Sequence, residues 1–324
     1  MMKTPEARPN VLLLETIATP ADEVLRAHSQ VIFAETPATG ENHINNLPIH
    51  AIVTRGKGQV NRSLIDACKG LQIIARCGVG LDNVDVDHAS SRGVRVVNAP
   101  GSNSATVAEH ALSLMLMLQR KMALAANKVK AGNWGYRATY DGDDLRGKRL
   151  GILGFGNIGQ RVAKLASAFG MDVQFWDART LDSNFEQVSL EEIIEHAHVI
   201  SIHLPLLEST KGLLSLEALS HAKHNPIIIN TARGGLIKDA DVLQALKKGI
   251  ISGFGADVLE IGTPPAGYEL LQLDEVIVTP HSASLTQTTY AEMCLITVQN
   301  TLDLLSHKPI DERYIFNRAD VILN

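Results

Sequence analysis

The chain has 324 residues, of which 45% are hydrophobic and 20% are charged, and its formal net charge is −5. This length allows two domains of ordinary size, and the negative charge argues against nucleic acid or an anionic membrane as a partner. No apolar segment approaches the roughly 20 residues that span a bilayer. Three widely separated cysteines, none at a metal-ligand spacing, indicate reduced thiols in a cytoplasmic protein and predict no metal site.

The first third of the chain alternates short apolar runs with helical stretches. The runs have the length of β-strands and lie at 11–14, 31–33, 51–53, 73–75 and 94–97. Residues 21–27 and 62–68 carry apolar side chains at helical spacing. This order predicts a parallel sheet with helices on both faces. A turn-rich stretch then leads into a long apolar helix, for which we expect Ser104 to be the N-cap.

A glycine-rich turn follows the next apolar run, Arg149–Leu153. Its glycines are Gly154, Gly156 and Gly159, and residues 160–169 continue at helical spacing. The first glycine allows a tight turn, the second lets the backbone approach a pyrophosphate, and the third lets the helix pack against the strand. The start of the helix presents unpaired N–H groups to the phosphates. The segment therefore predicts a dinucleotide-binding turn.

An acidic residue supports this interpretation. Asp177 ends the next apolar run, close to the position about 20 residues after the glycines where a carboxylate binds the ribose hydroxyls. A carboxylate there repels a 2′-phosphate, so the sequence favours NAD over NADP. Arg179 leaves some tolerance of NADP open, since its charge suits a phosphate.

The strand and helix alternation restarts at the glycine turn. Six runs predict a doubly wound parallel sheet, at 149–153, 173–176, 199–203, 227–230, 253–256 and 276–279. Helical stretches lie between them, and one more helix is expected at about 286–305. We therefore predict two α/β domains, a substrate domain of residues 1–102 and 286–324 and an NAD-binding domain of residues 103–285.

Candidate catalytic side chains follow the strands of the second sheet, at the end where such sheets bind ligands. Arg233 is flanked by glycines, and its planar guanidinium suits the carboxylate and carbonyl oxygens of a 2-oxo acid. His281 suits the proton that moves together with a hydride. The alternatives are a surface arginine and a structural histidine. His203, just before Pro205, is expected to line the cofactor pocket without a catalytic role.

Two loops of the first domain are candidates for substrate binding. The segment Gly78–Gly80 follows a strand and could present backbone N–H groups to a carboxylate, or be a plain glycine turn. Arg55 and Lys57 place two cations on a neighbouring loop, where they either contact the far end of a substrate or are simply exposed.

These motifs together resemble the D-2-hydroxyacid dehydrogenase family, and within it the D-3-phosphoglycerate dehydrogenase branch. The resemblance runs from about Ala51 to about Tyr290 and rests on Gly78–Asp85, Val97–Pro100, Val107–Glu109, Gly154–Gly159, His203–Pro205, Asn230–Gly234, Asp257–Val258 and Thr279–His281. It implies a Rossmann-type NAD domain inserted in a flavodoxin-like substrate domain. It also implies a homodimer paired through the 105–118 helix and interconversion of a small D-2-hydroxy acid and its 2-oxo acid.

The resemblance also assigns roles to residues. Arg233 is expected to bind and polarise the 2-oxo acid and His281 to be the acid–base group. Val79 and Gly80 are expected to bind the substrate carboxylate through their amides, beside Gly78 and Arg55. Contacts with NAD are expected at Gly154, Gly156, Asn157, Ile158, Gly159, Asp177, His203, Pro205, Thr231, Ala232, Arg233, Asp257 and His281.

One catalytic residue of the family is missing. Family members carry a glutamate five positions after the residue that matches Asp257, and Gly262 stands there in this chain. An alignment shifted by one residue puts Thr263 there, which is not an acid either. Glu260 is the remaining candidate partner for His281. Without such a partner, reduction of the oxo acid, which needs a protonated imidazole, should favour mildly acidic pH.

The substrate stays open at this level. Phosphoglycerate dehydrogenases usually carry Arg-Ser-x-Thr where this chain has Arg55-Gly-Lys-Gly58, so the expected hydroxyls are missing and Lys57 is an added cation. Substrates of the 3-phosphoglycerate, hydroxypyruvate and glyoxylate type are comparable candidates. The alternative functions are an NAD(H)-sensing, corepressor-like binding protein with little turnover, or a dehydrogenase of another small anion such as formate or phosphite.

Overall fold

The computed structural model describes residues 8–34, 44 and 47–318. The chain divides into two compact units. Unit 1 comprises residues 1–103 and 285–324, and unit 2 comprises residues 104–284. Within the described ranges, none of the helices combines the length and the apolar character needed to cross a membrane.

Unit 1 is built on five parallel strands in the order β2-β1-β3-β4-β5, which is the flavodoxin-like order. The expected apolar runs form these strands, which are β1 (Asn10–Leu13), β2 (Gln30–Phe33), β3 (Ala51–Thr54), β4 (Ile73–Arg76) and β5 (Arg95–Val97). Every residue of β1 and β3 is buried. Both sheet faces are covered, as expected for a parallel sheet whose central strands read as continuous apolar runs.

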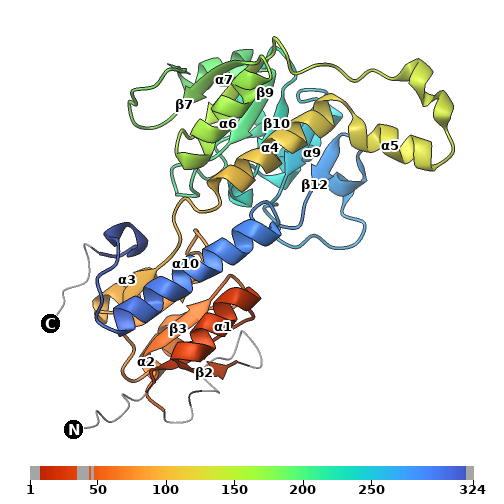
Figure 1. Cartoon of the computed structure of the whole chain (residues 1–324). Coiled ribbons are helices and arrows are strands. Elements are labelled where there is room, and N and C mark those ends of the chain that lie inside the picture. Colours follow the sequence, from red (N-terminus) through yellow and green to blue (C-terminus); the bar gives the residue numbers. More distant parts are fainter. Residues whose placement is uncertain (1–7, 35–43, 45–46, 319–324) are drawn as a thin grey trace, which may run out of the picture. The chain divides into compact units, whose positions relative to one another are not determined.

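Helices cover both faces of the sheet of unit 1. On one face, α1 (Thr19–His28) packs beside α10 (Gln287–Leu305), and both contribute to one hydrophobic core. Figure 1 shows these two helices side by side over the strands. On the other face, α2 (Arg62–Ala67) and α3 (Val86–Ser91) enclose a second core. A short 3₁₀ helix, η5 (Glu312–Tyr314), follows α10.

Unit 2 contains a parallel sheet of seven described strands in the order β12-β11-β10-β9-β6-β7-β8. The strands are β6 (Arg149–Leu153), β7 (Asp172–Trp176), β8 (Glu186–Gln187), β9 (Val199–Ile202), β10 (Ile227–Asn230), β11 (Gly253–Ala256) and β12 (Val276–Val278). The prediction of six strands was one too few. The additional edge strand β8 has two polar residues, so no hydrophobic pattern marks it.

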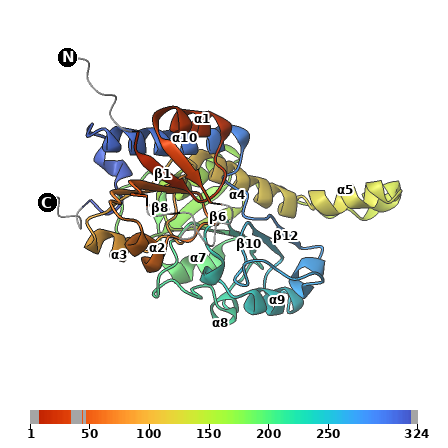
Figure 2. The same ribbon diagram turned by 90° about the horizontal axis from the view of Figure 1, so that it is seen from below.

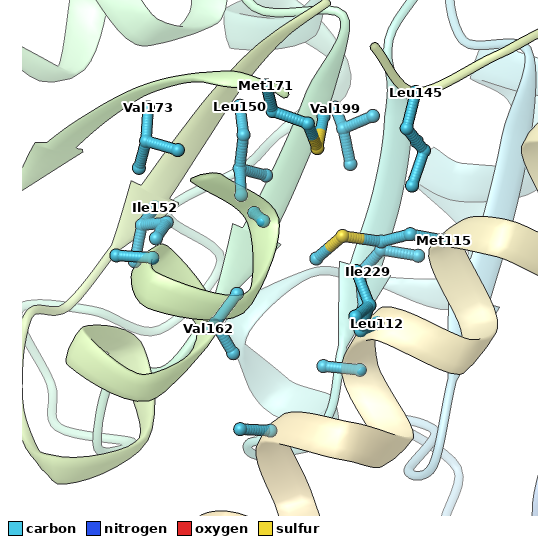
Figure 3. Close-up of a cluster of buried hydrophobic side chains, with 14 of the residues drawn as sticks. Leu112, Met115, Leu145, Leu150, Ile152, Val162, Met171, Val173, Val199 and Ile229 are labelled. Carbon is cyan, nitrogen blue, oxygen red and sulfur yellow. The ribbon is translucent and has the colours of Figure 1, made fainter. Parts of the chain in front are cut away.

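Alternate residues of these strands face two separate cores. Ile229 of β10 packs with α4 (Ser104–Gln119) and α6 (Asn157–Ala168), whereas Ile228 packs on the opposite face. Figure 3 shows Leu112 and Met115 of α4 beside Ile229. The opposite face is covered by α7 (Leu190–His196), α8 (Leu216–Leu219) and α9 (Asp239–Lys247). Ser104 is the first residue of α4 rather than the N-cap that the sequence suggested.

One part of unit 2 was not predicted. After α4 the chain forms α5 (Met122–Lys130) and the 3₁₀ helix η2 (Trp134–Thr139), and neither helix has a buried residue. Figures 1 and 2 both show α5 projecting away from the seven-stranded sheet. Two further 3₁₀ helices, η3 (Gly234–Leu236) and η4 (Glu269–Gln272), follow β10 and precede β12. Because α5 and η2 bury no residue and α5 projects from the sheet, we call the segment 122–139 the α5–η2 arm.

Candidate functional site

The predicted site residues of unit 2 follow a single row of paired residues across the sheet. In this row Leu153 pairs with Trp176 and Ile202, Asn230 pairs with Ile202 and Ala256, and Ala256 pairs with Val278. Because all these strands are parallel, the residues that come next lie at the same edge of the sheet. Those residues are Asp177, Gly154, His203, Thr231, Asp257 and Thr279. The structure thus brings together six chain segments that are far apart in sequence.

The glycine turn lies where the strand order reverses, between β6 and β9. A side chain on Gly154 would come within 2.7 Å of the carbonyl oxygen of His203, and one on Gly159 within 2.2 Å of the carbonyl oxygen of Gly154. Gly156, at the N-terminus of α6, has open space where a Cβ would lie, and no side chain caps this helix. The turn therefore leaves a helix N-terminus free to accept an anion, as dinucleotide-binding sites do.

Asp177 is fixed beside this turn. Its carboxylate accepts the N–H of Phe155 at 2.9 Å and pairs with the guanidinium of Arg179 at 3.0 Å. The hydrogen bond from Arg179, followed by those from backbone N–H groups, lowers the pKa of Asp177 to about 2 even though burial opposes ionisation. The residue expected to bind ribose is therefore a charged acceptor whose orientation is already set.

Two buried polar atoms at this edge lack a partner among the described residues. They are Nδ1 of His203 and Oγ1 of Thr231, both in residues expected to contact NAD. The other ring nitrogen of His203 lies 2.8 Å from the Ser201 hydroxyl, and burial lowers the pKa of this imidazole to about 3. A neutral imidazole and a hydroxyl without partners fit a site that a polar ligand completes. These atoms and the open glycine turn are compatible with a dinucleotide.

Arg233 lies on the loop after β10, and the side chain of Asn230 holds the backbone of this loop through two hydrogen bonds. The Asn230 side chain donates to the Arg233 carbonyl at 2.9 Å and accepts the N–H of Ala232 at 3.1 Å. One guanidinium nitrogen of Arg233 donates to the Ala232 carbonyl at 2.8 Å. A Cβ on Gly234 would come within 2.1 Å of the Leu259 carbonyl oxygen, so only glycine allows this loop to approach the segment after β11. The backbone that carries the arginine is tightly held.

Asp257 holds the segment that carries His281. Its buried carboxylate accepts the hydroxyl hydrogen of Thr279 and the N–H groups of Ser282 and Ala283, the last two at 2.8 Å. The N–H of His281 donates to the Asp257 carbonyl at 3.0 Å. His281 has a φ of 53°, a left-handed conformation that non-glycine residues rarely adopt, and its side chain is exposed. The fixed backbone presents this imidazole at the surface of unit 2.

Glu260 has a different partner from the one considered in the sequence. Its carboxylate accepts the N–H of Asp239 at the start of α9, at 3.3 Å. Across the part of the chain that the structure describes, no hydrogen bond or ion pair joins Glu260 to His281. Gly262 has a φ of +75°, so a glutamate at this position would be strained. The backbone of this turn therefore disfavours an acid at the position where the family glutamate is expected.

His110 is a site residue that sequence reasoning missed. It lies on α4, with its Nε2 2.9 Å from the Thr279 hydroxyl oxygen and 3.9 Å from a carboxylate oxygen of Asp257. The only signal in the sequence is its place directly after the segment Val107–Glu109, which belongs to the resemblance. Nothing in that pattern indicates which residue the imidazole contacts.

In unit 1, the loop that carries Arg55 is organised by Glu15, which the sequence did not single out. One carboxylate oxygen of Glu15 accepts the four successive N–H groups of residues 55–58, at 2.7 to 3.2 Å. Burial alone would raise the pKa of Glu15, but these four bonds lower it below its usual value. Arg55 lies 3.5 Å from Glu15 and donates to the Tyr290 hydroxyl at 3.2 Å, whereas Lys57 is exposed. The amides of this loop are therefore turned inward.

The neighbouring glycine loop has free amides. Among the described residues, no group accepts a hydrogen bond from the N–H of Val79 or Gly80. Their loop is held from behind, because the carbonyl oxygens of Gly78 and Val79 accept bonds from Ala99 and Asn98. Gly78 has a φ of +156°, a backbone conformation that residues with a side chain rarely adopt, so glycine is favoured there. The expected carboxylate-binding amides are therefore available in unit 1.

Comparison with known proteins relates these features to one protein family. Residues 112–283 match the family model described as D-isomer specific 2-hydroxyacid dehydrogenase, NAD binding domain. D-3-phosphoglycerate dehydrogenase of Archaeoglobus fulgidus is 34% identical over 306 residues, which cover 93% of this chain and 58% of that protein. Hydroxypyruvate reductase of Thermotoga maritima is 40% identical over 237 residues, covering 72% of this chain and 77% of the relative.

This chain belongs to the D-isomer-specific 2-hydroxyacid dehydrogenase family. Solved structures agree. The TT0316 protein from Thermus thermophilus has a TM-score of 0.86 at 32% identity, over 92% of this chain and 97% of its own. D-lactate dehydrogenase from Aquifex aeolicus, complexed with NAD and lactic acid, has a TM-score of 0.83 at 25% identity, over 92% of this chain and 96% of its own.

Residues 112–283, which match the family's NAD-binding domain, lie within unit 2. The two α/β units, each built on a parallel sheet, have the predicted fold class. The cofactor is NAD, as the sequence predicted. This chain spans 58% of the length of the Archaeoglobus fulgidus relative.

Proposed function

We propose that the protein is an NAD-dependent dehydrogenase that interconverts a small D-2-hydroxy acid and its 2-oxo acid. The observation that carries the proposal is that Arg233, Asp257 and His281 follow three neighbouring strands, β10, β11 and β12, whose last residues Asn230, Ala256 and Val278 pair across the sheet. Hydrogen bonds of Asn230 and Asp257 fix the backbone on either side. Convergent charged and titratable groups at this edge of an α/β sheet are typical of an active site.

The side chains divide the chemistry between them. Bound NAD supplies or accepts the hydride. The Arg233 guanidinium would hold the oxo acid through two parallel hydrogen bonds and polarise its carbonyl group, because it keeps its charge at all relevant pH values. His281 would give a proton to the carbonyl oxygen in reduction and remove it from the hydroxyl in oxidation, because an imidazole changes charge near neutral pH. In unit 1, the amides of Val79 and Gly80 are our candidates for binding the carboxylate.

The substrate class follows from the loop around Arg55. Its four amides are directed at Glu15 and do not form an anion-binding nest. Glu15 also offsets the charge of Arg55, so Lys57 is the cation of this loop without a described ion pair. This arrangement favours a 2-oxo acid with a small uncharged substituent, of the hydroxypyruvate or glyoxylate type, over a phosphorylated one. The relatives named hydroxypyruvate reductase and glyoxylate reductase support this choice.

A second candidate function is an NAD(H)-sensing protein with little turnover. The observation that favours it is the engagement of Glu260 with Asp239 together with the left-handed glycine at 262, which leaves His281 without a carboxylate partner in the described structure. Loss of the acid that assists a catalytic histidine lowers the rate of proton transfer.

One screen separates these functions. NADH oxidation would be followed with glyoxylate, hydroxypyruvate, phosphohydroxypyruvate and pyruvate at several pH values, and NAD reduction with formate and phosphite. We expect turnover with hydroxypyruvate or glyoxylate, and a loss of roughly 100- to 10,000-fold in Arg233→Ala and His281→Ala. NADH binding by fluorescence shows that the variants are folded. NADH binding without turnover on any oxo acid would instead establish a sensor.

We further propose a homodimer formed through the α5–η2 arm. The sequence suggested the 105–118 helix as the interface, but the apolar residues of α4 are mostly buried in the core of unit 2. The arm instead exposes large apolar side chains, with Met122, Val129 and Trp134 at 53%, 48% and 74% exposure. Exposed apolar patches of this kind mark protein interfaces. Cys68, Cys77 and Cys294 form no disulfide in the described structure, and this supports a reducing, cytoplasmic location.

A further inference from the structure

His110 makes the polar contact from α4 to the segment that carries His281. The fold places its imidazole against Thr279 and Asp257 and not in solvent, with 23% of the side chain exposed. We propose that His110 is a positioning residue that holds the His281 segment in place through Thr279 and Asp257. The inference deepens the proposed function and rests on it for its kinetic part, because that function assigns the proton to His281.

The direction of the hydrogen bonds is set by the chemistry of the three groups. A carboxylate only accepts hydrogen bonds, so the Thr279 hydroxyl donates its single hydrogen to Asp257. The hydroxyl oxygen can then only accept, and the group 2.9 Å away is Nε2 of His110. His110 therefore carries a hydrogen on Nε2 and begins a chain of two bonds that ends on the buried carboxylate. A chain of this kind polarises each bond and strengthens it.

The chain ends on the group that fixes His281. Asp257 binds the N–H groups of Ser282 and Ala283 with its carboxylate and that of His281 with its carbonyl oxygen. The backbone of His281 has a left-handed conformation, which a non-glycine residue keeps only where the surrounding structure enforces it. Loss of the His110 donor leaves the Thr279 hydroxyl free to turn toward the Ala256 carbonyl oxygen, which lies 3.4 Å away. Asp257 would then lose one of its bonds and the segment one of its attachments.

The absence of a glutamate next to His281 makes this attachment more important. With a glycine at 262 and Glu260 bound to Asp239, no described carboxylate orients the imidazole directly. Its position then depends on the backbone of its own segment. The catalytic geometry is thus controlled from α4, a helix that is not itself expected to touch the substrate.

Two substitutions of His110 separate the hydrogen bond from the bulk of the side chain. His110→Gln keeps an amide N–H donor at the place of Nε2, and His110→Leu keeps a similar volume without a donor. Ser113→Ala, one turn further on the exposed side of α4, is the matched control. The first measurement is hydrogen–deuterium exchange of the peptide covering 279–283 in the free protein. The second is a comparison of kcat and KM with the substrate that the NADH screen identifies.

We expect His110→Leu to speed exchange in 279–283 at least about 10-fold and to lower kcat by roughly 10- to 100-fold with little change in KM, because small displacements of a catalytic group are costly. His110→Gln and Ser113→Ala should stay within about 3-fold of the wild type in both measurements. The proposal would be overturned if residues 279–283 exchanged at the wild-type rate in His110→Leu. A His110→Gln variant as impaired as His110→Leu would also overturn it, because the donor would then not be the cause.

The exchange measurement does not depend on catalysis. If no oxo acid is turned over but exchange follows the expected pattern, the positioning role stands and the proposed function fails. Should His110→Leu not fold, Thr279→Val removes the hydroxyl from the middle of the same chain. It should speed exchange in 279–283 to the same extent, and unchanged exchange there would also overturn the proposal.

Discussion

Glu260 and Asp239 cap one another in unit 2. The Glu260 carboxylate accepts the N–H of Asp239, and the Asp239 carboxylate accepts the N–H of Glu260 at 3.1 Å. Asp239 also accepts the N–H of Ile261 and the hydroxyl of Tyr268. Burial, and then the bond to Asp239, raises the pKa of Tyr268 to about 12. The acid nearest in sequence to the missing catalytic glutamate is thus engaged at the start of α9.

This pairing predicts a structural role for Glu260. In Glu260→Gln we expect a loss of about 0.5–1 kcal/mol in the free energy of unfolding, because a charge at a helix N-terminus becomes neutral. Turnover should stay within about 3-fold of the wild type. Urea unfolding and steady-state kinetics check the two parts, with the exposed Glu208→Gln as control. A 10-fold loss of turnover at unchanged stability would instead assign Glu260 to proton transfer.

The ion pair of Asp177 and Arg179 predicts how cofactor preference can be changed. In Asp177→Ala the ribose acceptor is lost and Arg179 is released, so NADH should bind roughly 10- to 100-fold more weakly while NADPH gains. Fluorescence titration with both cofactors measures this. Because the pKa of Asp177 is about 2, the NADH preference of the wild type should not change between pH 5 and 8. The double variant Asp177→Ala, Arg179→Ala should bind NADPH more weakly than Asp177→Ala alone. Equal NADPH affinities of the two variants would show that Arg179 does not contribute to NADPH binding.

The imidazole of His203, whose Nδ1 is buried, predicts a loss of stability in acid. The pKa of His203 in the folded protein is about 3, below the ordinary value of 6.5. Between these two pH values the unfolded chain therefore binds a proton at this residue and the folded protein does not. Stability from this residue is therefore complete above pH 6.5 and falls as the pH drops from there toward 3, by at most about 1.4 kcal/mol per pH unit. His203→Gln should remove this dependence. Urea unfolding between pH 7.5 and 4.5 tests it, and parallel curves for both proteins would refute the assignment.

The α5–η2 arm predicts the assembly state. Trp134 is 74% exposed, and a large aromatic side chain at the centre of an interface supplies much of its binding energy. We expect Trp134→Ala to weaken a homodimer by roughly 10- to 100-fold in Kd, measured by sedimentation over a range of concentrations. Phe169→Ala, at an exposed aromatic residue outside the arm, should leave association unchanged. A wild-type chain that sediments as a monomer would refute the proposal.

Local patterns were sufficient to predict all of the described strands except β8, and the cofactor turn. The runs at 149–153, 227–230 and 253–256 became strands with the predicted bounds, because a buried parallel strand needs a continuous apolar segment. The glycines at 154 and 159 are required by contacts of the backbone with itself, which any sequence with this turn must respect. The edge strand β8 and the α5–η2 arm were missed, because polar edges and solvent-exposed helices carry no apolar periodicity.

The sequence by itself determined the fold class, the NAD-binding turn and the residues that follow the strands, because these depend on spacing along the chain. Only the tertiary structure decided the partners of the polar side chains. It placed the Glu260 carboxylate at the N-terminus of α9, the Glu15 carboxylate at the amides of the Arg55 loop, and His110 against Thr279. The sequence separations are 21, 40 and 169 residues. A hydrogen bond depends on positions within a few tenths of an ångström, and only the packed chain sets such positions between segments so far apart.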